Sequence, residues 1–193
     1  TASVPELQRN TFDGKASADG WVLTLNELLE KGKAASQAEW DAEDEGEQEA
    51  VFQDAIQRVL TLLKTRTGFD AIGIRLRQGD DYPYLVQEGF SSEFLLAENS
   101  LIAQTTDGEI CRDPDGNVKL ECTCGLVLSG QTDPTNPLFT PGGSCWINDA
   151  RPLLDLPASD DPRLHPRNQC IHHNYASVAL VPIRDKERIV GLI

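Results

Sequence analysis

The segment DAIGIRLRQGDDYPYLVQE, residues 70–88, predicts a β-hairpin. Apolar side chains occupy alternate positions in residues 70–77, which is the repeat of a strand with one buried face. Residues 78–81 (Gln-Gly-Asp-Asp) have the composition of a turn, and residues 82–88 return as the partner strand. We therefore expect the two arms to pair in an antiparallel sheet.

A strongly periodic helix is predicted just before this hairpin. Between residues 47 and 67 apolar side chains recur at intervals of three and four, forming the stripe Phe52, Ala55, Ile56, Val59, Leu60 and Leu63. A stripe of this width packs against a sheet or a second copy of the helix. Gly68 supplies the stop signal, and the change of period at this residue predicts a helix lying on one face of the sheet.

The second half of the chain predicts another hairpin after a long insertion. Residues 91–99 have a serine N-cap and a short helical pattern, whereas residues 100–174 are rich in Gly, Pro, Asp and Cys. Residues 175–183 and 189–193 then form the second hairpin. This order predicts an α+β domain: a central antiparallel sheet with flanking helices and a long insertion between two β-hairpins.

The first part of the chain is expected to lie outside this domain. Residues 1–44 are interpreted as an N-terminal tail and linker helix, with a helical pattern over residues 21–40, and residues 45–193 as the folded domain. The acidic run at residues 41–49 is interpreted as a solvent-facing segment. Because there is no Met and the chain ends inside an apolar strand, we expect the natural protein to continue past Ile193.

Composition excludes several classes of partner. The 193 residues carry a formal charge of −14, with a pI near 4.5, which argues against nucleic acid or an anionic membrane surface as the main partner. No apolar run reaches the roughly 18–20 residues that span a bilayer, and no signal-peptide pattern opens the chain. We therefore expect a cytoplasmic protein.

All the cysteines lie in the insertion. The five are Cys111, Cys122, Cys124, Cys145 and Cys170. An odd number cannot pair completely within one chain, and a cytoplasmic location favours thiol, metal or redox chemistry over structural disulfides.

Three hypotheses for these cysteines stay open. In the first, Cys122, Cys124 and Cys170 ligate zinc or an iron–sulfur cluster, with Cys111 or Cys145 as the fourth ligand. In an extended segment the two sulfurs of C-x-C share one side, so we expect the first three sulfurs within about 7 Å of each other. The second hypothesis is a reversible disulfide, and the third is free thiols that pack as small hydrophobes.

Two other features of the insertion are ambiguous. His172 and His173 have no catalytic companion at a recognisable spacing, although either could replace a cysteine as a ligand. Trp146 is interpreted either as a core side chain or as one wall of a cavity next to the three sulfurs.

These segments together resemble a known family. The helix at residues 47–67, followed by TGFDAIGIRLRQGDDYPYLVQEGFSSEF and later by NYASVALVPIRDKERIVGLI, resembles a GAF domain, a small-molecule sensor module of bacterial histidine kinases, phosphodiesterases and phytochromes. The strings YPYLVQEGFSSEFLLAEN, LECTCG and GGSCWIN are similar to a cysteine-containing subgroup attached to sensor histidine kinases. The cyclic-nucleotide signature and the phytochrome Cys-His pattern are absent.

The resemblance implies a regulatory sensor domain of a two-component signalling protein, with no catalytic residue of its own. A small ligand, metal or redox cofactor would bind under the insertion, residues 91–174, and the flanking helices would signal to an output domain in the same polypeptide. The resemblance also implies a homodimer. The candidate ligand-binding residues are Phe90, Cys122, Cys124, Cys145, Trp146 and Cys170.

Two alternatives compete with this expectation. One branch of the GAF family reduces free methionine-R-sulfoxide with cysteine thiolates, which needs a nucleophilic and a resolving cysteine. The other alternative is a purely structural dimerisation module.

Overall fold

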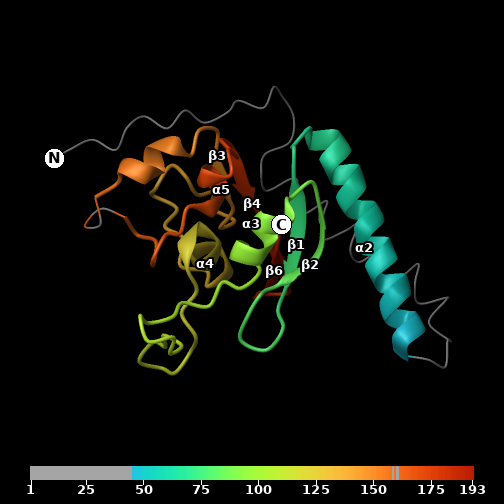
Figure 1. Ribbon diagram of the computed structural model, residues 1–193, viewed down its shortest axis with the longest axis horizontal. Helices are drawn as coiled ribbons and strands as arrows, with labels where there is room; N and C mark the ends of the chain where they lie inside the picture. The colour runs from blue at the N-terminus through green and yellow to red at the C-terminus, as the bar shows by residue number, and fades with distance from the viewer. Residues whose placement is uncertain (1–44, 158, 160) are drawn as a thin grey trace.

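The computed structural model describes residues 45–157, 159 and 161–193, and over these residues the chain has a mixed α+β fold (Figure 1). One antiparallel sheet has four strands in the order β2-β1-β6-β5, and a second sheet pairs β3 with β4. The helix expected over residues 21–40 lies outside the described residues. No helix within the described part of the chain is long and apolar enough to cross a membrane.

The first hairpin and its preceding helix are confirmed. Helix α2 spans Glu45–Thr67, strand β1 spans Ile72–Leu76 and strand β2 spans Tyr84–Glu88. The two strands pair antiparallel, with a register shift after Ile74. Gly68 ends α2 in the left-handed region, with φ of 71°, where glycine carries no steric penalty.

The second hairpin is confirmed in part, because residues 178–180 of its expected first arm pair with β3 (Cys145–Ile147) in the other sheet instead of with residues 189–193. Strand β5 (Pro182–Asp185) pairs antiparallel with β6 (Arg188–Leu192), and β6 pairs with β1 in the middle of the sheet. Val181, which separates β4 (Val178–Leu180) from β5, exchanges two backbone hydrogen bonds with Ile193, of 2.8 and 2.9 Å. The polypeptide therefore runs almost continuously from one sheet into the other.

Helix α2 covers one face of the four-stranded sheet, as expected. The core there is aliphatic, and its buried members are Ile56, Leu60, Ile72, Ile74 and Ile183. Phe52 and Leu63, two further residues of the stripe, pack against it. The core of this layer is apolar, and at its edge Thr61 and Lys64 of α2 donate to the Glu88 carboxylate of β2, at 2.9 and 3.2 Å.

The insertion lies on the other side of the sheet (Figure 1). It contains α3 (Ser92–Glu98), α4 (Cys122–Leu128), β3 (Cys145–Ile147), the 3-10 helix η1 (Arg151–Asp155) and α5 (Gln169–His172). The Oγ of Ser91 accepts a hydrogen bond from the Phe94 N–H and caps α3, as expected. The larger core lies here and includes Leu101, Val127 and Leu192.

Candidate functional site

A buried arginine marks the insertion side of the sheet. Arg75 of β1 is 2% exposed, and its guanidinium carbon lies 3.7 Å from the centroid of the Tyr84 ring. Its Nη1 donates to the carbonyls of Tyr82, at 2.8 Å, and Asn99, at 3.1 Å. Its Nη2 donates to the Glu98 carbonyl. The positive charge is thus held by carbonyl dipoles and an aromatic face, away from water.

A second arginine completes a clamp on the end of α3. Arg167 donates from Nη1 to the Ala97 carbonyl, at 3.0 Å, and from Nη2 to the Ser100 carbonyl, at 2.8 Å. Together with the two bonds from Arg75, four consecutive carbonyls, residues 97–100, are bound by the two guanidiniums. The last carbonyls of a helix have no partner inside the helix, so this clamp fixes where α3 ends.

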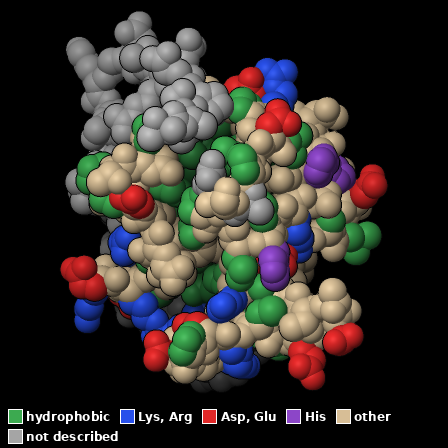
Figure 2. All heavy atoms as spheres, turned by 90° about the vertical axis from the view of Figure 1, so that its left-hand side faces the viewer, with side chains coloured by type: hydrophobic (Ala, Val, Ile, Leu, Met, Phe, Trp, Pro, Cys, Tyr) green, Lys and Arg blue, Asp and Glu red, His purple; other side chains and the backbone are tan. Residues whose placement is uncertain are grey.

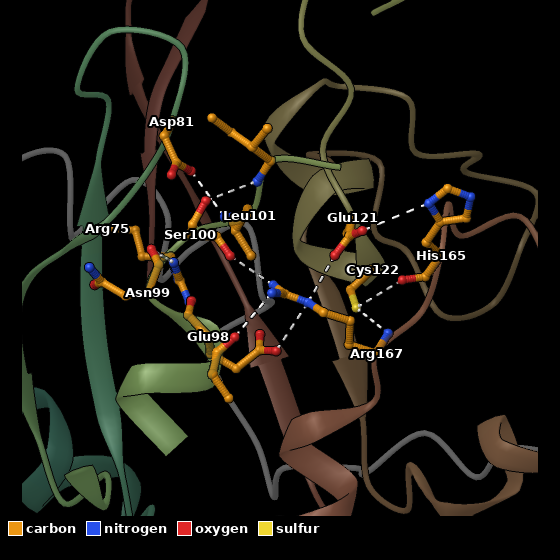
Figure 3. Close-up of polar contacts among 12 residues, drawn as sticks. Arg75, Asp81, Glu98, Asn99, Ser100, Leu101, Glu121, Cys122, His165 and Arg167 are labelled. Carbon is orange, nitrogen blue, oxygen red and sulfur yellow. Dashed lines mark hydrogen bonds and ion pairs between the residues drawn. The ribbon is translucent and has the colours of Figure 1, made fainter. Parts of the chain in front are cut away.

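Two carboxylates balance the two arginines (Figure 3). The Nε of Arg167 lies 2.9 Å from Oε2 of Glu121 and 3.3 Å from Oε1 of Glu98. Both glutamates are buried residues. Burial raises the pKa of Glu98, the nearby Glu121 acts in the same direction, and the charges of Arg167 and Arg75 oppose the rise. The cluster joins the sheet, α3, the start of α4 and the loop over residues 161–168.

Cys122 connects the same loop to α4. Its Sγ accepts a hydrogen bond from the Arg167 backbone N–H, at 2.9 Å, and lies 3.9 Å from the His165 carbonyl. Its own N–H donates to the Leu164 carbonyl, at 2.9 Å. Its φ is 61°, a conformation uncommon for a residue other than glycine. The His165 imidazole stands 3.8 Å from Glu121, at the exposed edge of the cluster.

The expected geometry of Cys122-x-Cys124 is wrong. The two residues begin α4, and a helix does not place residues two apart on the same side, as a strand does. Negative charge on Cys122 or on Cys170 would raise the pKa of Cys124, which indicates that the three cysteines lie in the same region of the insertion. Cys124 and Cys170 pack against the larger core, and Cys145 lies inside it. Cys111 is half-buried and lies in the loop over residues 102–120, which isolated antiparallel β-bridges hold together.

The described residues do not arrange these thiols as a metal site. All five cysteines are free, and burial raises the pKa of Cys124 and Cys145 to about 12 and that of Cys170 to about 11. Metal ligation and nucleophilic attack both use the thiolate. Among the described residues, no group of three or more His, Cys, Asp or Glu side chains is placed to hold a metal ion. The geometry therefore gives the metal hypothesis no support.

An aromatic cluster surrounds Phe90, the one candidate residue outside the insertion. Its rings are Tyr84, Phe90, Phe94, His173 and Tyr175. Phe90 stacks on Phe94, with centroids 4.7 Å apart. Gly73 makes room for these rings, because a Cβ there would lie 2.6 Å from Cε1 of Tyr84. Only Phe90 was identified from the sequence, since the other rings come from separate elements.

The side chain of Trp146 lies on the face of β3 opposite to those of Cys145 and Ile147. It alternates along β3 with Cys145 and Ile147, both of which are buried in the larger core, so its side chain leaves the opposite face of the strand. Its Nε1 and the Oγ of Ser144 are buried without a hydrogen-bond partner in the described part of the chain. The expectation that Trp146 walls a cavity beside the three sulfurs therefore gains no support.

The remaining face of the insertion is polar at its edge. Figure 2 shows histidines and charged side chains scattered over this side of the molecule, with no single charged patch dominating the visible surface.

No family model, curated protein or solved structure matches this chain. The inference of function accordingly rests on the site itself.

Proposed function

We propose that residues 45–193 form a GAF-like sensor domain of a signalling protein, and that a small ligand binds on the sheet face covered by the insertion. The observation that carries this proposal is the buried, charge-balanced cluster of Arg75, Glu98, Glu121 and Arg167. Arg75, Glu98 and Glu121 are buried and Arg167 is half-buried; burying such charges costs desolvation, and apolar side chains of similar size often replace such groups without loss of stability. A cluster of this kind, with a shifted carboxyl pKa, is a candidate functional site.

The cluster also supplies a route for a signal. The carbonyls of residues 97–100 bind one arginine from the sheet and one from the loop over residues 161–168. A ligand that changes the hydrogen-bond partners of either arginine shifts α3 relative to β1. Helix α2 packs on the opposite face of the sheet that contains β1, so the shift can reach it. Such a ligand shifts a two-state equilibrium by its difference in affinity for the two states, about 1.4 kcal/mol for each tenfold.

The experiment is hydrogen exchange on the full chain with and without compounds selected by thermal shift from amino acids, amines, organic acids and nucleotides. We expect a hit to raise the midpoint temperature and to change exchange in α3 and α2 together. A Phe90→Leu substitution should reduce the rise in midpoint temperature that the compound causes. Leu154→Ala, at a position 43% exposed on η1, should leave that rise unchanged. Hits that act equally on both variants, or that leave α2 unchanged, would contradict the proposal.

A structural dimerisation module is the second candidate. Val51, 37% exposed, and Leu62, 47% exposed, lie on the same side of α2, with half-buried Ala55 and Val59 between them. This second stripe favours contact with another copy of the chain. Light scattering that gives a dimer in the wild type and a monomer in a Val51→Asp/Leu62→Asp variant would support it, whereas a monomeric wild type would exclude it.

The reductase alternative has less support. The raised pKa values of the buried cysteines leave them as neutral thiols near pH 7, and the thiolate is the nucleophile. Ligand binding is the better-supported role for this side of the sheet.

A further inference from the structure

Arg167 lies between two glutamates that are more deeply buried than its own side chain. The side chains of Glu98 and Glu121 are 8% and 11% exposed, whereas that of Arg167 is 26% exposed. The two carboxylates are thus more deeply buried than the arginine side chain that reaches them from the loop over residues 161–168 (Figure 3).

The ionic contacts here are not matched by hydrogen bonds. Oε1 of Glu98 and Nε of Arg167 are both buried, and neither has a hydrogen-bond partner of adequate geometry within the described residues. Arg167 therefore neutralises the carboxylates without satisfying them. Its backbone explains this, because its N–H is bound to Cys122 and its Nη atoms are committed to the carbonyls of Ala97 and Ser100.

We propose that Glu98 and Glu121 form a binding site for a small organic cation, a guanidinium or a primary amine, and that Arg167 occupies this site in the absence of the ligand. The proposal rests on the sensor function and names its ligand class. Two adjacent carboxylates accept charge-assisted hydrogen bonds from such cations. A free ligand is not tied to the loop, so it can align with the buried oxygens as Arg167 does not.

The charges favour a cation over other ligands. With Arg167 displaced, Glu98 and Glu121 carry two negative charges, and Arg75 supplies one positive charge that acts on Glu98. One ligand cation restores the balance, whereas an anion would meet two carboxylates. Displacement also breaks the bonds from Arg167 to Ala97 and Ser100, which couples binding to the end of α3.

The test uses the full chain with Arg167→Ala and the side-chain analogue n-propylguanidinium. Removing the internal competitor should make binding at least tenfold tighter than in the wild type, seen as a saturable rise in melting temperature and by calorimetry. Propylamine should bind more weakly, and acetate should give no saturable shift. Arg112→Ala, which removes an exposed arginine paired with Asp80 at 3.5 Å, is the matched control and should behave as the wild type.

A second substitution decides whether the carboxylates are responsible. Adding Glu121→Gln to Arg167→Ala should remove the saturable shift. If Arg167→Ala does not fold, Glu121→Gln alone should weaken binding of n-propylguanidinium to the otherwise wild-type chain. No saturable binding in any variant, or equal binding with and without Glu121, would overturn the proposal.

The outcomes also separate this site from the sensor function. Binding of the cation without any change in α2 exchange supports the site and contradicts the sensor function. A signalling response to another compound, with no binding of guanidinium or amine, supports the sensor function and overturns the cation site.

Discussion

The two faces of the four-stranded sheet are stabilised by different kinds of interaction. On the α2 face the buried side chains are all aliphatic, and the layer is complete once α2 docks. On the insertion face an apolar core surrounds buried Arg75, Glu98 and Glu121. Apolar contacts are non-directional and tolerate small shifts, whereas buried charges demand particular partners. On the proposed function, the α2 face is the scaffold and the insertion face is the part that responds to a ligand.

The largest expected effect belongs to the α2 face. Replacing Ile56, 5% exposed, by Asp should lower the free energy of unfolding by about 4 kcal/mol or more, because an unpaired carboxylate loses its hydration. Urea denaturation measures this. Val51→Asp on the outer side of α2 should cost less than about 0.5 kcal/mol. Equal effects at the two positions would show that α2 does not pack as described.

The arginine clamp should produce the next largest effect. Arg75→Met keeps much of the side-chain volume but leaves three carbonyls without their donor and removes one of the two positive charges that act on Glu98, so we expect a loss of about 3 kcal/mol in the free energy of unfolding, measured by urea denaturation. Arg77→Met is the control, because Arg77 lies just after β1 with an exposed side chain whose Nε donates to the Gly79 carbonyl, at 3.0 Å. An Arg75→Met protein as stable as the wild type would mean that the cluster is an interchangeable part of the core.

The sequence predicted the scaffold better than the site. The repeats of 3.6 and 2 residues located α2, β1 and β2, because each depends on neighbours along the chain. The clamp joins residues 75, 97–100 and 167, and no local repeat contains that information. A charged residue inside an apolar strand was the available signal for Arg75.

The C-x-C motif shows a different limit. Its interpretation depended on whether the segment is extended or helical, and the residues around it give no period to decide this. The helix α4 begins at Cys122 with a left-handed backbone conformation stabilised by contacts from the loop over residues 161–168. Those contacts come from more than 40 positions away along the chain.

Alkaline pH should weaken the insertion face through its thiols. The pKa of Cys124 is raised from 9.0 to about 12 by burial, so the stabilisation from the neutral thiol is present below pH 9 and is lost as the pH rises toward 12. The expected slope is up to about 1.4 kcal/mol per pH unit for each such thiol. Urea denaturation between pH 8 and 11 should show a smaller slope in Cys124→Ala than in Cys111→Ala. Identical slopes would contradict the burial of Cys124.

The smallest effects distinguish one carboxyl on each face. Burial raises the pKa of Glu98, so its contribution to stability is lost as the pH rises through the folded-state value. The free energy of unfolding of Glu98→Gln should therefore increase relative to that of the wild type from pH 4 to 8. Hydrogen bonds from Thr61 and Lys64 of α2 lower the pKa of Glu88, so its contribution to stability is lost as the pH falls. The free energy of unfolding of Glu88→Gln should therefore decrease relative to that of the wild type as the pH rises from 4 to 8. Urea midpoints against pH measure both. Trends of the same sign would remove the electrostatic difference between the faces.

The most direct test of the difference between the faces is hydrogen exchange in the Arg167→Ala variant of the full chain. We expect the amides near the end of α3, at residues 95–99, to lose at least tenfold protection, while those of α2 around Leu60 and of β1 keep theirs. Unchanged protection in α3, or an equal loss in α3, α2 and β1, would contradict a clamp that acts on the insertion face alone.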